Sequence, residues 1–135
     1  MMLSLKKVFF LIVSLSLLIA CVASNEDEYV EIDGIVSYRT PVTLPDTAIL
    51  TVKLKNIADH TQPPIVLDEL NKEKVALPTR FSFTVPLNEF VKGHMNIIQA
   101  YVKYKDKLIF MELNAVNVNL NSQEPLLIML EKVSE

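Results

Sequence analysis

From residue 29 onward, apolar and polar side chains alternate with a period of two, the pattern of half-buried β-strands. The clearest example covers residues 48–54, and similar segments begin near residues 30, 80, 98, 108 and 116. Turn-forming residues separate these segments at intervals of roughly 8–12 residues. The spacing predicts an all-β fold: a single antiparallel β-sandwich of Ig-like, Greek-key type with about 7–8 strands.

Several segments allow more specific structural predictions. Residues 65–70 follow two prolines, which predicts an edge strand because proline cannot donate to a ladder. Residues 126–130 are apolar on both faces, which predicts a central strand covered on both sides. Residues 87–92 fit one helical turn that Gly93 would end with a positive φ. The alternation also predicts these core residues: Leu50, Val52, Leu54, Phe81, Phe83 and Val102.

The first 20 residues have the pattern of a secretory signal. Lys6 and Lys7 precede an apolar run that is too short to span a membrane as a helix. Residues 18–21, Leu-Ile-Ala-Cys, resemble a bacterial lipobox, in which the cysteine becomes the lipidated first residue of the mature protein. The resemblance makes Cys21 the expected lipidation site. The alternative is a free thiol near the end of an ordinary signal.

These observations predict three parts: a lipoprotein signal peptide over residues 1–20, a lipidated tether over residues 21–28, and a β-sandwich domain over residues 29–135. The tether is acidic and has the composition of a flexible linker. Val22 stands where inner-membrane lipoproteins commonly have Asp, so the resemblance favours the outer membrane. We therefore expect a lipid-anchored protein of the cell envelope that faces the periplasm.

Composition narrows the possible partners and chemistry. Without Lys6 and Lys7, the remaining 11 basic and 16 acidic residues give a net charge of −5, which disfavours nucleic-acid binding. The chain has two glycines, two histidines and one cysteine, so it lacks a glycine-rich phosphate loop and a disulfide pair. We expect no metal site, no cofactor and no catalysis, because no nucleophile or ligand set has the required spacing. We also expect a monomer.

Two surfaces are candidates for binding a partner. The first consists of apolar residues on the nominal outer faces of the strands: Ile35, Ile49, Ile97 and Tyr101, with Tyr29 nearby in the pattern. They form one exposed patch if their strands pair, or scattered single residues if they do not, and the sequence leaves both possibilities open. The second candidate is the predicted edge strand, which carries Val66.

The chain also resembles a known family. Residues 34–39 (Gly-Ile-Val-Ser-Tyr-Arg) and 42–54 look like the first half of the YbaY/YscW lipoproteins, and residues 81–83, 93–94, 98–102 and 126–133 echo the second half. The resemblance implies a small β-sandwich on a lipidated cysteine. Its best-understood branch consists of pilotins, chaperones that bring a type III secretion secretin to the outer membrane. The chain departs from the commoner pattern at Asp46 and Asp106, where the family often has Pro and Gly.

The resemblance therefore implies a pilotin-like assembly chaperone whose partner is a secretin tail. The alternative is an envelope lipoprotein of the same fold with a structural or stress-related binding role and no secretin partner. An envelope hydrolase is the least supported of the three functions. A mature charge of −5 favours a partner tail that carries Lys or Arg.

Overall fold

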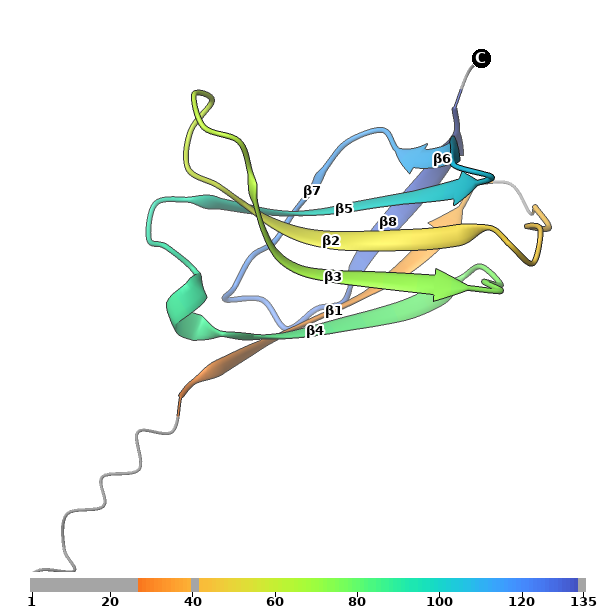
Figure 1. The fold of residues 1–135 in the computed structure, drawn as a ribbon. Helices are drawn as coiled ribbons and strands as arrows, with labels where there is room; N and C mark the ends of the chain where they lie inside the picture. The colour runs from red at the N-terminus through yellow and green to blue at the C-terminus, as the bar shows by residue number, and fades with distance from the viewer. Residues whose placement is uncertain (1–26, 40–41, 134–135) are drawn as a thin grey trace, which may run out of the picture.

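The computed structural model describes residues 27–39 and 42–133, and these fold into an all-β domain (Figure 1). The strands are β1 (Tyr29–Tyr38), β2 (Ile49–Ile57), β3 (Ile65–Glu73), β4 (Thr79–Pro86), β5 (Met95–Tyr104), β6 (Lys107–Glu112), β7 (Val116–Asn117) and β8 (Leu126–Lys132). A single 3-10 turn, η1 (Leu87–Glu89), joins β4 to β5. The all-β prediction is thus confirmed.

All the strands belong to one continuous sheet in the order β3-β2-β5-β6-β8-β1-β4, and β7 pairs with β5. The sheet curls until its two edge strands, β3 and β4, approach each other (Figure 1). Lys72 of β3 crosses the remaining seam, where its Nζ donates a hydrogen bond to the backbone oxygen of Arg80 on β4, at 2.7 Å. The result is a nearly closed, barrel-like sheet.

This architecture differs from the predicted sandwich in two ways. The strands form one curled sheet where two stacked antiparallel sheets were expected. In addition, β1 and β8 pair in parallel, with Gly34 opposite Leu126 and Tyr38 opposite Leu130. A period of two reports which face of a strand is buried but not which strand lies beside it, so the alternation could not distinguish these arrangements.

The interior consists of the inward-facing side chains of β1, β2, β4, β5, β6 and β8. All six predicted core residues are buried: Leu50, Val52, Leu54, Phe81, Phe83 and Val102. The Phe81 and Phe83 rings pack with their centroids 5.7 Å apart. Removing such side chains from water is the main source of stability for a domain of this size.

Most local predictions also hold. β3 is an edge strand as expected, although it extends to Glu73. Gly93 has a φ of +86° after the short helical turn. The expectation that β8 is covered on both faces is wrong: its inner face is buried, but Leu127 is 59% exposed on its outer face. Neither a second layer nor a helix covers the outer side of β8 in the part of the chain that the structure describes.

Candidate functional site

The predicted lipidation site, Cys21, lies outside the described residues. The described domain begins close to it, since β1 starts at Tyr29. Within residues 27–39 and 42–133, no helix has the length and apolar character needed to cross a membrane. Lipidation of Cys21 therefore stays a prediction.

The outer-face residues chosen from the sequence fall into two groups. Ile49 lies on β2, and Ile97 and Tyr101 lie on the neighbouring strand β5. Ile35 lies on β1, which β6 and β8 separate from β5. The four residues therefore do not form one patch.

The β2–β5 group is interrupted by polar side chains. Ile49 is paired with Lys103, and Tyr101 is paired with Thr51. The ammonium groups of Lys53 and Lys103 each lie 5.5 Å from the centre of the Tyr101 ring, a distance at which a cation is attracted to an aromatic face. Tyr101 is thus half-buried between two lysines, so it is a poor candidate for an apolar anchor that a partner could contact.

Ile35 has apolar neighbours that the sequence reasoning missed. Its cross-strand partner on β8 is Leu127, and Met129 follows on the same outer face, opposite Ser37. Met111 on β6 continues this face, opposite Glu131. The sequence signal for this face is that residues 126–130 are apolar on both faces, a pattern that by itself predicts burial on both sides.

The edge strand β3 provides the second predicted surface. Ile65 is 60% exposed and Val66 is 44% exposed, close to the bulge between Leu54 and Lys55 of β2. One side of β3 is paired with β2, and on its other side the sheet ends. Its position makes β3 available for pairing with an extended segment.

The polar residues considered for chemistry have structural roles. His94 Nδ1 lies 2.7 Å from Asn56 Oδ1, and the Asn56 amide donates to Asn96 Oδ1 at 2.8 Å. This network fixes the start of β5 against the end of β2. No group of three or more His, Cys, Asp or Glu side chains among the described residues could hold a metal ion.

Glu112 is a buried carboxyl group that sequence reasoning did not single out. Its Oε2 accepts a hydrogen bond from the backbone N–H of Ala100 at 2.8 Å. On β5, Ala100 lies between the residues that pair with β6 and those that pair with β7, so neither strand is opposite it. The Glu112 side chain therefore accepts the hydrogen bond that a neighbouring strand would otherwise accept from the Ala100 N–H. Burial raises the pKa of Glu112, although the Ala100 hydrogen bond acts in the opposite direction.

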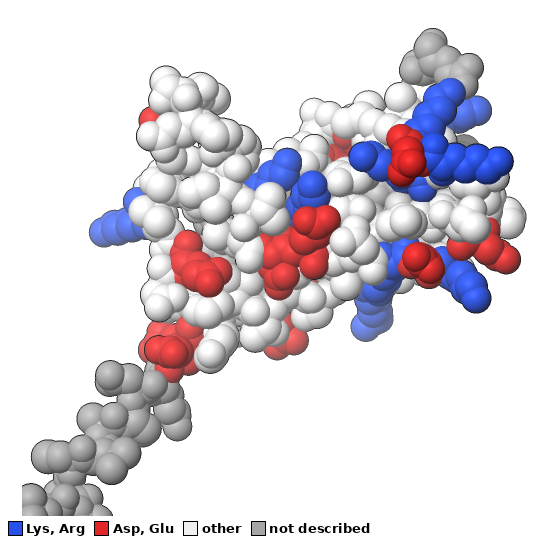
Figure 2. Space-filling model, in the orientation of Figure 1, with Lys and Arg blue, Asp and Glu red and all other residues white. Residues whose placement is uncertain are grey.

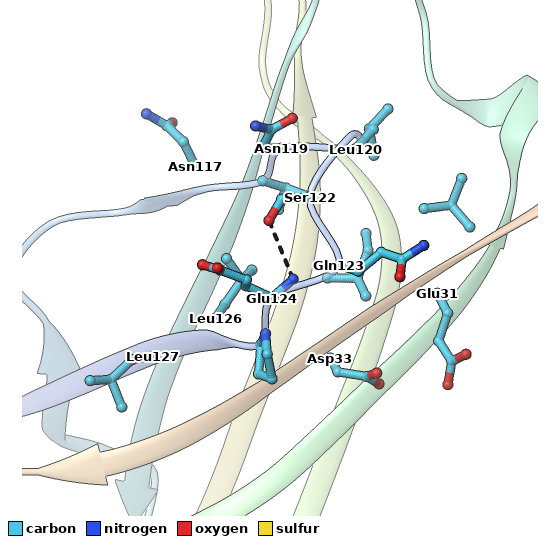
Figure 3. A pocket seen from close by; sticks show the side chains of 14 residues that line it. Glu31, Asp33, Asn117, Asn119, Leu120, Ser122, Gln123, Glu124, Leu126 and Leu127 are labelled. Carbon is cyan, nitrogen blue, oxygen red and sulfur yellow. Dashed lines mark hydrogen bonds between the residues drawn. The ribbon is translucent and has the colours of Figure 1, made fainter.

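A polar pocket of about 260 Å³ lies between β1 and the segment that connects β7 to β8 (Figure 3). Glu31 and Asp33 line it from β1, and Asn119, Ser122 and Gln123 line it from the connection. The Ser122 hydroxyl accepts a hydrogen bond from the Glu124 backbone N–H at 3.3 Å, which stabilises the loop. The acidic lining disfavours anionic ligands.

A second hollow lies at the opposite end of the domain, where β1 and β8 end and β6 begins. We call it the mouth groove. It has a volume of about 660 Å³ and is lined by Tyr38, Val42, Ile109, Phe110 and Leu130, with Arg39, Glu131 and Lys132 at its rim. The Tyr38 and Phe110 rings pack with centroids 4.6 Å apart. The Tyr38 hydroxyl is buried without a hydrogen-bond partner among the described residues, and burial raises the pKa of Tyr38 to about 12.

A family model described as type III secretion system lipoprotein chaperone (YscW) matches residues 27–129, which is most of the chain. The chain belongs to the YscW family. The resemblance in the strand and turn patterns is thereby confirmed. Because this is a chaperone family, the prediction of a non-enzymatic protein is confirmed as well.

The fold of this YscW-family chain has a known counterpart. A solved structure of an alternative pilotin from the type II secretion system of Vibrio cholerae superposes with a TM-score of 0.69. The two sequences are 23% identical, and the match covers 80% of this chain and 100% of the pilotin chain. No curated protein sequence matches the chain.

Proposed function

We propose that this protein is a pilotin-like chaperone that is anchored in the outer membrane through a lipid on Cys21 and assists the assembly of a secretin. The observation that carries the proposal is the match of residues 27–129 to the lipoprotein chaperone family. The likeness of the fold to a pilotin from another secretion system supports it. A chaperone of this kind needs an anchor, a stable domain and an accessible binding surface, and it needs no catalytic group.

The proposed anchor would keep the domain close to the membrane. Cys21 is eight positions before Tyr29, so an extended tether would hold the start of β1 within about 30 Å of the lipid. A multiply acylated cysteine anchors stably, because each buried methylene contributes about 0.8 kcal/mol. The domain would then lie at the periplasmic surface of the outer membrane.

The first test is the anchor. The Cys21→Ser variant should lose the lipid and should no longer fractionate with the outer membrane, because the lipid is the proposed attachment. It should either become soluble or stay uncleaved, with the apolar run of its signal retained. Metabolic labelling with a fatty-acid analogue measures the loss of the lipid directly. Label on the Ser variant, or unchanged fractionation with the outer membrane, would contradict the proposal.

The second test is the secretin. In cells that produce the wild-type chain, the secretin should fractionate with the outer membrane and form heat-resistant multimers. In cells that produce Cys21→Ser, the secretin should remain monomeric or be found elsewhere in the envelope. Normal secretin assembly in cells that lack the chain altogether would favour the alternative, an envelope lipoprotein with no secretin partner.

A further inference from the structure

Charged side chains are segregated along the strand axis. At the end where β1 and β8 terminate, the basic residues are Arg39, Lys74, Lys103, Lys105, Lys107 and Lys132, against the acidic residues Asp46, Glu73, Asp106 and Glu131. At the opposite end, the described acidic residues are Asp27, Glu28, Glu31, Asp59, Glu89 and Glu124, against the basic residues Lys55 and Lys92. In Figure 2 most of the basic groups, in blue, lie at the right of the view, with a few at its centre and left. We call the two ends the basic end and the acidic end.

The mouth groove lies at the basic end. Leu130 and Phe110 form its buried floor, and Val42, which is 43% exposed, stands at its side. Arg39 Nε lies 3.1 Å from Glu131 Oε1. The positive and negative charges of this ion pair at the rim therefore largely neutralise each other. Lys132 lies at the rim, and Lys103, Lys105 and Lys107 belong to the β5–β6 hairpin, so basic residues outnumber acidic ones at this end.

Backbone geometry produces this groove. At the β5–β6 ladder the register shifts between Val102 and Lys103, so that Phe110 is opposite Val102 while Leu108 is opposite Lys103. Ile109 is the extra residue of this bulge, and its backbone oxygen accepts a hydrogen bond from Val133 N–H at 3.0 Å instead. The bulge bends the strand at the rim and places Ile109 beside Phe110 in the groove lining.

The position of the groove argues against a membrane as its occupant. The chain enters the domain at the acidic end, and β1 then runs ten residues, or about 33 Å, to the basic end. If Cys21 is lipidated as proposed, the chain leads from the lipid to the acidic end, and the groove lies at the opposite end of the domain. An apolar hollow bordered by basic residues, at the end of the domain far from the proposed anchor, matches a protein segment that combines apolar and acidic side chains.

We infer that the mouth groove binds an acidic amphipathic segment of the secretin, with one or two large apolar side chains inserted between Val42 and Ile109 and carboxylates facing the lysines of the basic end. The inference rests on the proposed function for the identity of the partner. The partner segment inferred here is acidic, whereas the net charge of the chain favours a basic tail. The two differ because the residues around the groove are mostly basic while the chain as a whole is acidic.

Fluorescence anisotropy with the purified full-length protein in mild detergent tests the inference. The probes are overlapping labelled peptides of about 20 residues that together cover the secretin. The tightest-binding peptide should carry a net negative charge. Its affinity should fall when salt is raised from about 50 to about 300 mM, because screening weakens exposed charge interactions.

Two pairs of variants locate the site. Val42→Glu and Lys132→Glu alter the groove and its rim, and each should weaken binding about tenfold or more, which corresponds to about 1.4 kcal/mol. Val91→Glu and Lys92→Glu make the same charge changes at exposed positions of the acidic end, so they should bind within about threefold of wild type. Unchanged unfolding midpoints in urea show that each variant folds.

Three results would overturn the inference: a basic peptide that binds tightest, groove variants that bind like their controls, or no peptide that binds at all. A different result would contradict the pilotin role itself: a secretin that fractionates with the outer membrane equally well with and without this chain. If the secretin does depend on the chain for this fractionation while the groove variants bind normally, the secretin uses another surface, such as the exposed edge of β3 or the outer face around Ile35.

Discussion

At the scale of single residues, the polar groups inside this domain have structural roles. Glu112 completes the hydrogen bonding of β5 where β6 and β7 leave a gap, and the Asn56–Asn96 pair connects the adjacent ends of β2 and β5. A buried polar group stabilises a fold only when its hydrogen bonds are made. By this criterion Glu112 is satisfied at a cost of desolvation, whereas the Tyr38 hydroxyl finds no partner in the described part of the chain.

The buried carboxyl of Glu112 makes stability depend on pH. Because burial raises its folded-state pKa above the ordinary 4.5, protonation favours the folded state. This contribution is fully present below pH 4.5 and is lost as pH rises through the higher folded value. Gln keeps an oxygen that can accept from Ala100, so Glu112→Gln should be at least as stable as wild type at pH 7.

Urea unfolding of wild type and Glu112→Gln across pH 4 to 8 checks this prediction. The advantage of the Gln variant should shrink toward acidic pH, where the wild-type carboxyl becomes neutral. A Gln variant that is less stable than wild type at pH 7 would show that the charged form of Glu112 is the stabilising one.

Tyr38→Phe removes a hydroxyl that has no hydrogen-bond partner within residues 27–39 and 42–133, while keeping the ring that packs on Phe110. Loss of an unsatisfied buried polar group is nearly neutral or stabilising, so the free energy of unfolding should stay within about 1 kcal/mol of wild type or rise. Equilibrium urea unfolding at neutral pH measures it. A larger loss of stability would mean that the hydroxyl is hydrogen-bonded in solution.

At the scale of secondary-structure elements, close approach between strands depends on small residues. Gly34 on β1 is buried, and Phe81 of β4 is its cross-strand partner. A Cβ added at Gly34 would lie 2.3 Å from Cζ of Phe81 and 2.9 Å from the backbone oxygen of Leu126. The Phe81 ring therefore occupies the space that any other residue at position 34 would need.

Gly34→Ala should destabilise the domain by about 1–3 kcal/mol, the usual range for overpacking a core. Because the clash involves the Phe81 ring, Gly34→Ala combined with Phe81→Leu should lose less stability than the sum of the two single changes. Urea unfolding of the four proteins gives this coupling. Strict additivity would show that the Leu126 carbonyl, and not the ring, is the obstacle.

At the scale of the whole molecule, the last strand links the two halves of the sheet. β8 lies between β6 and β1, with Ile128 and Leu130 buried in the core. Residues near the two ends of the chain thus pair directly, Tyr38 with Leu130 for example. Contacts between residues so far apart in sequence make folding cooperative, because neither half can bury its interior alone.

Removal of residues 126–135 should therefore abolish folding of the whole domain and not just fray one end. The truncated protein should lose the β-sheet signal in far-ultraviolet dichroism and be rapidly digested by protease, because β1 and β6 each lose a neighbour and the core is opened. Removal of residues 134–135 alone is the matched control and should leave the spectrum unchanged. A truncated protein that keeps cooperative unfolding would show that the rest of the sheet is self-sufficient.

The sequence by itself determined which residues form strands, which faces are buried and where several of the turns lie. Alternation over residues 48–54 and the turn at Gly93 are local features that a short stretch of chain encodes in full. Family membership could also be recognised at this level, since it rests on the same strand and turn pattern.

Only the tertiary structure decided which strands are neighbours, and with them the surfaces that a partner can use. The parallel pairing of β1 with β8 exposed Leu127 and set it beside Ile35, whereas Ile35 and Tyr101 were separated. The same pairing gathered Tyr38, Phe110 and Leu130 into the mouth groove at the basic end. Strand order and the separation of basic from acidic residues depend on contacts between distant parts of the chain. The period of the apolar residues and the net charge are properties of the sequence that contain no information about these contacts.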